Sequence, residues 1–474
     1  MNHSGKHSRL SGSIMKVMGI LTGVQMVQVI CSMVKMKLVS LWLDTTGIGL
    51  FGIFSNAVDT VSSLTDSGVR QTAVRTVSTE SNDPGALSRA VATVRGWSAV
   101  IAIAGALLMS ALSPLLSRIV FGDTKLWWSF ALLSFTMLCN SIASGEMAVN
   151  QGTRRFRYIA RISMFSSVTG LLLSIPMFRF MGDASVIPSI LVWSGATLCY
   201  ALWFRYRAPR KVKVTKTLLR EGSSLVRLGG YMAMALFMTN LAQMLFLAWL
   251  NRTASTSEVG LYNAGQILCV RYVGFVIAAV GMEFYPRLSA HIRSRERVEV
   301  FVSHEISLVL RVLVPLVLCF LIFRHFIVWV LYKSDFEVII PFISICIGHT
   351  VLRAASTCIA YTVVARGDGR LFLLTESADA FVGLGLCIAG YSLWGLEGIG
   401  AAYVVWFASY LTMSWLIFRF HYGYRLRPGA VASIASAVAT IGCAIAAVML
   451  LPAVVSACLL SIPAIFCLLR LKRI

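Results

Sequence analysis

The stretch GIGLFGIFSNAVDTVSSLTDSG, residues 47–68, is apolar or small over most of its length but carries Asp59 at its centre. Later in the chain, EVGLYNAGQILCVRYVGFVIAAVG, residues 258–281, has the same character with Arg271 in its middle. A helix that spans a bilayer needs about 20 mainly apolar residues, and a charge at that depth usually faces protein or a water-filled cavity. The two stretches therefore predict membrane helices that keep opposite charges inside the bilayer.

The composition of the whole chain also indicates a lipid environment. Of its 474 residues, 57% are hydrophobic and only 13% are charged, and the mean hydropathy is +0.78. A soluble domain carries about one quarter charged residues. Fourteen apolar runs are long enough to span: 14–42, 48–68, 90–113, 126–149, 159–180, 185–204, 228–250, 259–285, 304–332, 338–364, 371–392, 396–418, 430–451 and 453–469. The sequence predicts an all-α polytopic membrane protein.

The net charge of +22 follows the topology of the chain. Lysine and arginine cluster in alternate loops, and the connection 205–227 alone carries eight of them. The loops in between carry acidic residues such as Asp123, Asp335 and Glu337. By the positive-inside rule, both termini are predicted to be cytoplasmic and the number of spans to be even. The basic excess needs no nucleic-acid partner.

The cysteines and the loops argue against several other classes of protein. All eleven cysteines fall inside apolar runs without metal-ligand spacing, so we expect neither disulfides, a metal site nor a cofactor. The first apolar run is followed by KMKLVSLWLDTTG, residues 35–47, which is no small-residue cleavage site, so this run is expected to remain as a helix. No outward loop exceeds about a dozen residues. We expect no extracytoplasmic catalytic domain.

Three short patterns recur in the same order along the chain. The pairs Gln25/Gln28 and Asn240/Gln243 are offset by 215 residues. Gly49-Leu50-Phe51 and Gly260-Leu261-Tyr262 are offset by 211, and QGTRRF at 151–156 matches RGDGRL at 366–371 with an offset of 215. Six spans per copy is an even number, so both copies have the same orientation. This predicts a parallel repeat, as in transporters built from two equivalent lobes.

The repeat gives a domain organisation. We expect a six-helix lobe at 1–207, a basic cytoplasmic linker at 208–227, a second six-helix lobe at 228–420 and an appended pair of transmembrane helices at 421–474.

Four stretches together resemble the polysaccharide exporters and O-antigen flippases of the multidrug/oligosaccharidyl-lipid/polysaccharide exporter superfamily: residues 44–78, 150–163, 255–289 and 394–419. The resemblance covers nearly the whole chain but consists of glycine and turn patterns, with no catalytic signature. It implies two six-helix lobes that pass an undecaprenyl-diphosphate-linked oligosaccharide across the bacterial cytoplasmic membrane by alternating access. Polysaccharide assembly proteins and membrane lipid are the implied partners. Lys35 and Lys37, in the outer third of the first run, depart from the expected apolar pattern.

Basic residues deep in the spans are the candidates for binding an anionic cargo. Arg271 and Arg353 lie near the middle of their runs, and Lys35 is the deeper of the two lysines. Arginine presents a planar fork of donors that suits phosphate oxygens. Arg311 and Arg324 lie nearer the helix ends, where we expect them to snorkel to the interface.

Acids, amides and a histidine complete the candidate set. Asp59 and Asp379 are deep, and the repeat offset pairs Asp59 with Val270 or Arg271 in the second lobe, so that the two charges either line one cavity or have separate partners. Glu146 and Glu376 lie near cytoplasmic ends, where salt bridges are expected. The amides Gln28, Gln243 and Asn263 serve either sugar hydroxyls or contacts between helices. His349 is either a proton carrier that acts with Asp379 or a buried neutral side chain.

Two other functions are compatible with parts of this pattern. A cation-coupled multidrug exporter of the same superfamily would need acidic residues for a cationic cargo, whereas the deep charges here have a slight basic excess. A membrane polymerase or glycosyltransferase would need a sizeable aqueous loop, which the chain lacks. The sequence therefore favours a flippase without enzymatic activity.

Overall fold

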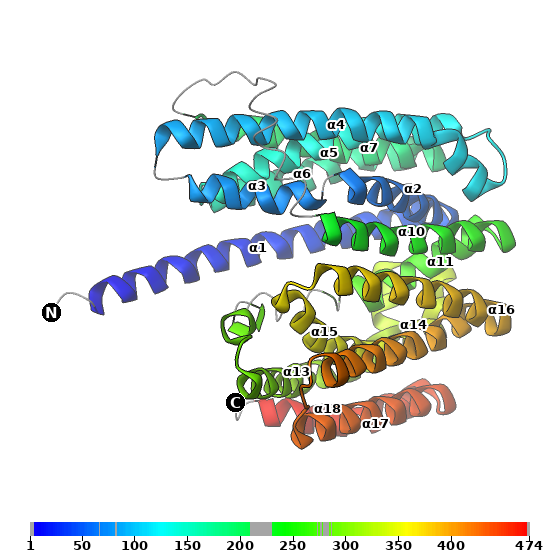
Figure 1. Ribbon diagram of the computed structural model, residues 1–474. Helices are drawn as coiled ribbons and strands as arrows, with labels where there is room; N and C mark the ends of the chain where they lie inside the picture. Colours follow the sequence, from blue (N-terminus) through cyan, green and yellow to red (C-terminus); the bar gives the residue numbers. More distant parts are fainter. Residues whose placement is uncertain are drawn as a thin grey trace. The chain divides into compact units, whose positions relative to one another are not determined.

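The computed structural model describes residues 4–65, 67–80, 83–208, 230–272, 274, 277, 284–285 and 287–471. Within these ranges, the side chains of residues 4–22, 67–72, 271–272, 453–454 and 465–471 lie outside the description. Every regular element in the described part of the chain is a helix (Figure 1). The chain divides into two compact units, Met1–Thr256 and Ser257–Ile474.

The described part of unit 1 contains eight α-helices and one short 3₁₀ turn: α1 (Ser4–Trp42), α2 (Asp44–Thr65), α3 (Ser67–Thr79), α4 (Pro84–Phe121), α5 (Trp127–Gly152), α6 (Phe156–Met181), η1 (Gly182–Ser185), α7 (Val186–Trp203) and α10 (Gly230–Thr253). Helices α4, α5 and α7 run side by side, and α1 packs against α6 (Figure 1). The helix α10 packs against α2 and α4. The boundary between the units at Thr256 therefore groups α10 with the N-terminal helices. The lobes expected from the sequence, with α10 at the start of the second lobe at 228–420, stay a prediction.

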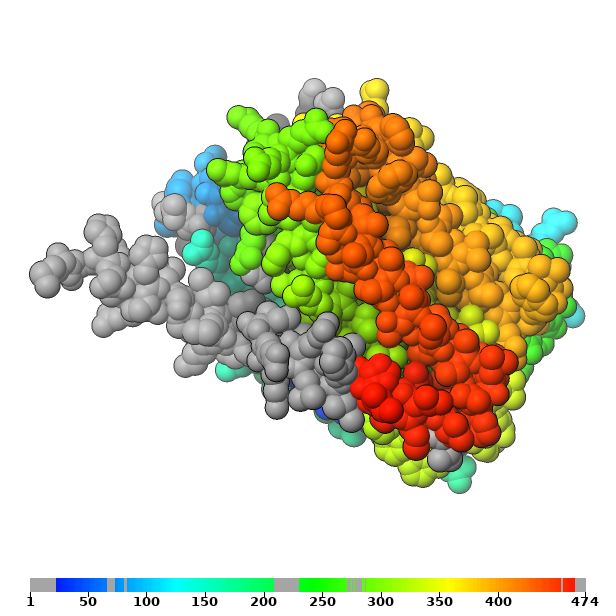
Figure 2. Space-filling model, turned by 90° about the horizontal axis from the view of Figure 1, so that it is seen from below, coloured from blue at the N-terminus to red at the C-terminus, as the bar shows by residue number. Residues whose placement is uncertain are grey.

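The regular elements in the described part of unit 2 are all helices: α11 (Thr256–Gln266), η2 (Ile267–Tyr272), α13 (Arg295–Leu331), η3 (Ser334–Ile339), α14 (Ile340–Cys346), α15 (His349–Arg366), α16 (Gly369–Leu416), η4 (Ile417–His421), α17 (Pro428–Leu450) and α18 (Ala453–Leu471). The predicted terminal pair, α17 and α18, packs against α13. Figure 2 shows these two helices, in orange and red, on the surface of the unit.

The predicted spans agree well with these helices. Thirteen of the fourteen apolar runs coincide with described helices, and the run 259–285 is described as helical as far as Tyr272. By length and hydropathy alone, eight helical stretches of the described chain qualify as spans, and two of them, Phe156–Trp203 and Gly369–His421, each contain two predicted spans. The all-α membrane fold is therefore confirmed.

The order of elements repeats at the spacing that the sequence patterns gave. The helix α2 begins at residue 44 and α11 at residue 256, which is 212 residues later. The helix α6 begins at residue 156 and α16 at residue 369, which is 213 residues later. Both α6 and α16 follow a tight turn with a positive φ, at Arg154 in the first copy and Gly367 in the second. The recurring patterns thus mark equivalent turns in two similar runs of helices.

The helix α3 was not predicted as a separate element. It occupies a connection that is rich in arginine and polar residues, and the sequence indicated only a loop there. Its buried Ala73 and Val77 pack with Leu87 and Val91 of α4 and with Val149 of α5. A short apolar face, too brief to span a bilayer, therefore holds this helix against the bundle.

The helix α16 is a hairpin of two spans. At Trp394 and Gly395 the backbone leaves the helical conformation, and Gly395 has a φ of 59°. On either side of this bend, the backbones of Gly390 and Gly398 touch: a Cβ at Gly398 would stand 1.9 Å from the carbonyl oxygen of Gly390. Only glycine, which has no Cβ, permits so close an approach. The bend brings residues about 30 apart in sequence side by side.

Candidate functional site

The hairpin α16 and the neighbouring α15 gather most of the predicted functional residues of unit 2. Arg353 lies on α15, one turn after His349, and it is largely buried. Its guanidinium carbon is 5.7 Å from the centre of the Phe407 ring, and Nη1 lies 3.5 Å from the carbonyl oxygen of Val270 in η2. Among the residues that the structure describes, no carboxylate forms an ion pair with Arg353. The partly buried guanidinium is thus held by an aromatic face and one long hydrogen bond.

Two carboxylates on the first half of α16 are bonded to aromatic side chains on its second half. The indole nitrogen of Trp406 donates a 2.7 Å hydrogen bond to Asp379. The hydroxyl of Tyr410 donates a 2.6 Å hydrogen bond to Glu376. The salt bridge expected for Glu376 is therefore wrong, because the hairpin places Tyr410 beside this carboxylate. The two carboxylates are three residues apart and the two donors are four residues apart. Residues at these spacings lie on the same face of a helix, so both pairs meet along one side of the hairpin.

A glycine makes room for the Trp406 indole. A Cβ built on Gly383, one turn from Asp379, would lie 2.2 Å from Cε2 of Trp406. Phe407 stacks beside Trp406, with ring centres 5.1 Å apart. The glycine therefore sets how close the indole lies to the first half of the hairpin, and with it the Asp379 hydrogen bond.

His349 is fully buried at the start of α15. Its Nδ1 lies 2.5 Å from the carbonyl oxygen of Cys346, so Nδ1 must carry the proton in this contact, because a carbonyl only accepts. Its ring lies 4.9 Å from that of Phe407 and 5.4 Å from that of Tyr403. Within the described chain, Nε2 has no hydrogen-bond partner. His349 is therefore buried, as the second of the two predicted alternatives requires. Its Nε2 atom is a hydrogen-bond acceptor without a partner among the described residues, and the ring lies beside Phe407, which also contacts Arg353.

Asn263 and Arg271 lie on the first helices of unit 2. Asn263 is buried in α11, and its amide nitrogen has no hydrogen-bond partner in the described part of the protein. Next to it, the Tyr262 hydroxyl is 2.9 Å from that of Tyr403 on α16. The backbone of Arg271 belongs to the π-helical turn η2, but its side chain lies outside the described residues. The predicted approach of Asp59 to Arg271 thus stays a prediction.

The remaining candidates lie in unit 1. The ammonium group of Lys35 is 4.3 Å from the centre of the Phe51 ring and 4.8 Å from that of Trp193, so the lysine of α1 lies between aromatic rings of α2 and α7. Asp59 is exposed on α2, and its carbonyl accepts a hydrogen bond from the Asn240 amide of α10. Gln28 on α1 and Gln243 on α10 are partly buried. The Asn240 side-chain amide thus links α10 to α2.

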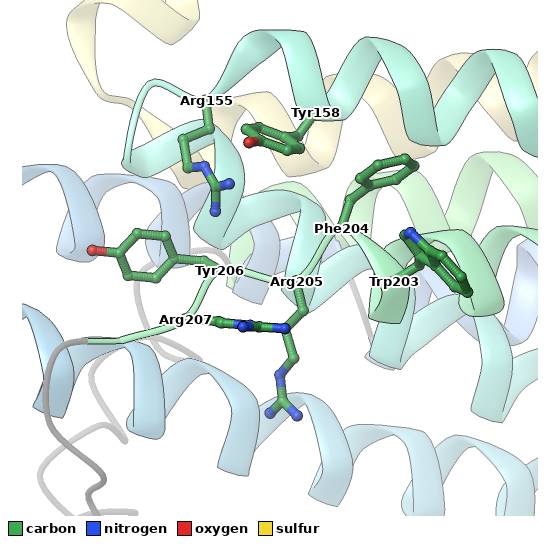
Figure 3. A pocket seen from close by; sticks show the side chains of 7 residues that line it. All are labelled: Arg155, Tyr158, Trp203, Phe204, Arg205, Tyr206 and Arg207. Atoms are coloured by element: carbon green, nitrogen blue, oxygen red, sulfur yellow. The ribbon is translucent and has the colours of Figure 1, made fainter.

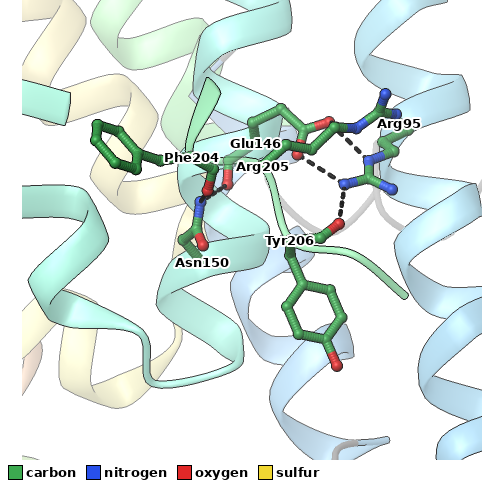
Figure 4. Close-up of polar contacts among 6 residues, drawn as sticks. All are labelled: Arg95, Glu146, Asn150, Phe204, Arg205 and Tyr206. Carbon is green, nitrogen blue, oxygen red and sulfur yellow. Dashed lines mark hydrogen bonds and ion pairs between the residues drawn. The ribbon is translucent and has the colours of Figure 1, made fainter. Parts of the chain in front are cut away.

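A buried ion network lies at the predicted cytoplasmic end of unit 1 (Figure 4). Glu146 of α5, 3% exposed, accepts two hydrogen bonds from Arg95 of α4, at 2.6 and 2.9 Å, and forms a 3.0 Å ion pair with Arg205 after α7. Arg95 also donates to the carbonyl oxygen of Tyr206. The salt bridge predicted for Glu146 is confirmed, and it joins three elements of the unit.

Arg324 does not snorkel as predicted. It is only 3% exposed, and it donates to the carbonyl oxygen of Leu321 at 2.7 Å and lies 3.5 Å from the Ser456 hydroxyl. The helix α18 packs over this part of α13 and covers the side chain, which a single-helix argument from the sequence could not foresee. Arg311, by contrast, is exposed on α13, and its snorkelling to the interface stays a prediction.

The ten described cysteines are free, and no group of three or more metal-ligating side chains occurs in the described part of the chain.

Comparison with known proteins identifies the family. A family model described as "Polysaccharide biosynthesis protein" matches residues 42–341, which is more than half of the chain. This protein belongs to that family. Curated proteins provide no match.

The fold of this polysaccharide biosynthesis family member is shared with solved transporters. The lipid II flippase MurJ, in an inward closed conformation, is similar with a TM-score of 0.69 and 11% identity over 95% of this chain and 98% of that one. An inward-facing multidrug resistance MATE family transporter of the MOP superfamily has a TM-score of 0.65 and 13% identity over 84% and 94%. An outward-facing MATE transporter has a TM-score of 0.55 and 14% identity over 86% and 96%. The chain thus shares its fold with these solved proteins.

Proposed function

We propose that this protein translocates an undecaprenyl-diphosphate-linked oligosaccharide across the bacterial cytoplasmic membrane by alternating access, for surface polysaccharide biosynthesis and without an enzymatic step. Membership of the polysaccharide biosynthesis family supports the pathway, and the fold shared with a lipid II flippase supports transport of a lipid-linked cargo. Contacts with polysaccharide assembly proteins are part of the proposal.

The observation that carries the proposal is the state of Arg353. A charged side chain inside a bilayer costs about 2.5–3.5 kcal/mol on insertion scales, and it normally has a partner. Arg353 has an aromatic face and a 3.5 Å contact with a carbonyl, and none of the described carboxylates pairs with it. Its remaining N–H groups are suited to bind diphosphate oxygens. In this proposal Arg271, Lys35, Asp59, Gln28, Gln243 and Asn263 contribute further contacts, and Asp379 and His349 couple transport to a cation or proton.

The test is translocation of lipid-linked oligosaccharide by the purified protein in proteoliposomes. Arg353→Gln should abolish translocation, and Arg353→Lys should recover only part of it, because a point charge cannot make two parallel bonds to phosphate. Arg311→Gln is the matched control, because this arginine is exposed on α13. Full activity of a well-folded Arg353→Gln protein would refute the role of Arg353.

A cation-coupled multidrug exporter is the second candidate. Asp379 and Glu376 lie together in the same cluster as Arg353, and the fold is shared with MATE transporters. Efflux of a cationic dye from cells that express the protein decides between the two. Dye efflux that depends on Asp379, without any change in surface glycan, would favour the exporter.

A further inference from the structure

A basic and aromatic pocket lies where α6 begins and α7 ends, at the predicted cytoplasmic end of unit 1. Its volume is about 410 Å³, and it is lined by Arg155, Tyr158, Trp203, Phe204, Arg205, Tyr206 and Arg207. Figure 3 shows Arg155 just before α6, Tyr158 in the first turn of α6, Trp203 at the end of α7 and the other four residues in the segment that follows α7. Three of the seven lining residues are arginines, and none is acidic.

The charges of this pocket are not neutralised by the nearby carboxylate. Glu146 binds Arg95 and Arg205, so it is already shared between two arginines. In the described part of the chain, no carboxylate pairs with Arg155 or Arg207. The pocket therefore keeps two positive charges for an anion.

Aromatic rings hold one of these guanidinium groups in place. The guanidinium carbon of Arg155 lies 3.8 Å from the centre of the Tyr158 ring and 5.4 Å from that of Tyr206. Stacking on an aromatic face leaves the in-plane N–H donors of arginine available, and these donors match phosphate oxygens. The side chain is thus oriented before any ligand binds.

The other wall of the pocket is apolar and exposed. Trp203 is 83% exposed at the end of α7, the position at which tryptophan lies at the interface of a membrane. Phe204 stacks on Phe165 of α6, with ring centres 6.2 Å apart. Phe165, Val168 and Leu172 are exposed and follow one face of α6 away from the pocket. An apolar stripe therefore begins where the cationic pocket ends.

We propose that this pocket binds the phosphate group of an anionic membrane lipid, whose acyl chains lie along Phe165, Val168 and Leu172. A free phosphate would use only the cationic wall, whereas an amphiphile uses both walls. Basic pockets on the cytoplasmic side of transmembrane helices bind lipid head groups in this way. The phosphate belongs either to a phospholipid or to the diphosphate head group of the cargo. Binding of a phospholipid does not depend on the proposed function, whereas assignment of the pocket to the cargo rests on it.

The test measures binding of fluorescent phosphatidylglycerol to the full chain in detergent, by anisotropy. Phosphatidylcholine, which has no net charge, should bind at least about tenfold more weakly to the unmodified protein. Arg155→Gln and Arg207→Gln should each weaken binding of phosphatidylglycerol, and the double variant should lose the preference for it. Arg157→Gln is the matched control, because Arg157 is exposed in the first turn of α6 but does not line the pocket.

Competition identifies the source of the phosphate. Undecaprenyl diphosphate and unlabelled phosphatidylglycerol are compared as competitors for the fluorescent lipid. If undecaprenyl diphosphate displaces it at the lower concentration, the pocket is assigned to the cargo head group. If phosphatidylglycerol does so, the pocket is assigned to a phospholipid. Displacement by inorganic diphosphate at equal concentration would overturn the role of the lipid chains. Unchanged affinity and preference in the double variant would overturn the site.

Arg207→Gln alters an exposed residue beyond the helix end, so it tests the pocket even where Arg155→Gln impairs folding. Because no translocation is measured, a negative result leaves the proposed function intact.

Discussion

The indole nitrogen of Trp406 donates a 2.7 Å hydrogen bond to the carboxylate of Asp379, and so joins the two halves of α16. Trp406→Phe keeps the ring but removes the donor. A hydrogen bond to a charged group contributes about 1.5–3 kcal/mol, and the carboxylate loses this partner. We expect translocation to fall at least about tenfold, which corresponds to about 1.4 kcal/mol, with the protein level retained. Trp415→Phe, in the same helix, should remain active in the same assay, whereas equal activity of both variants would contradict a role for the bond.

The same hydrogen bond can be disturbed from the opposite side of the hairpin. Gly383→Val would place side-chain atoms where the Trp406 indole lies, and overpacking of this kind costs about 1–3 kcal/mol. We expect a lower midpoint of thermal unfolding in detergent. The control is Gly385→Val, two residues further along, where a Cβ meets nothing within 4 Å. A similar loss in both variants would point to helix propensity instead of contact with Trp406.

Arg271 can be tested although its side chain is not described. If it binds the diphosphate, Arg271→Ala should abolish export of lipid-linked oligosaccharide without lowering the protein level, and Arg271→Lys should restore only part of it. If it is a structural partner of Asp59, the single variant should be unstable and the double neutralisation with Asp59→Asn should recover the protein. Surface glycan and protein level are measured together in all strains. Normal glycan with Arg271→Ala would leave Arg353 and Lys35 as the basic candidates.

Glu146 should be a major determinant of the stability of unit 1. Glu146→Gln removes the charge that Arg95 and Arg205 share, and breaking a buried ion pair costs about 3–5 kcal/mol. Thermal unfolding in detergent should therefore shift strongly. Asp123→Asn provides the comparison, because Asp123 is 48% exposed and lies 3.9 Å from Lys125, a surface pair worth about 0–1 kcal/mol. Equal stability of the two variants would show that solvent screens the Glu146 network.

The predicted topology is tested by labelling single cysteines in a variant without the eleven native ones. Asp335→Cys should react with an impermeant thiol reagent from outside the cell, and Lys213→Cys should react only after the membrane is opened. The opposite pattern would reverse the orientation of the chain and place the basic loops outside.

The spans and the order of elements could be predicted because apolar length and glycine patterns are local properties of the sequence. The turns at 151–156 and 366–371 lie where the repeats placed them. Partners in space were harder to predict. The motif WFASY at 406–410 faces Glu376 and Asp379 only because α16 folds back at Gly395, and the spacing of the two pairs was the one available signal. Arg324 was assigned to the interface because nothing in its own helix shows that α18 covers it.

The contact between Gly390 and Gly398 has a mechanical consequence. At this point no layer of side chains separates the two backbones, so the two halves of α16 are packed directly against each other beside the bend. We therefore expect the bend at Trp394 and Gly395 to keep its angle and not to act as a hinge. If Asp379 couples transport as proposed, a displacement of this residue should therefore move both halves of the hairpin together, including the bend at Trp394.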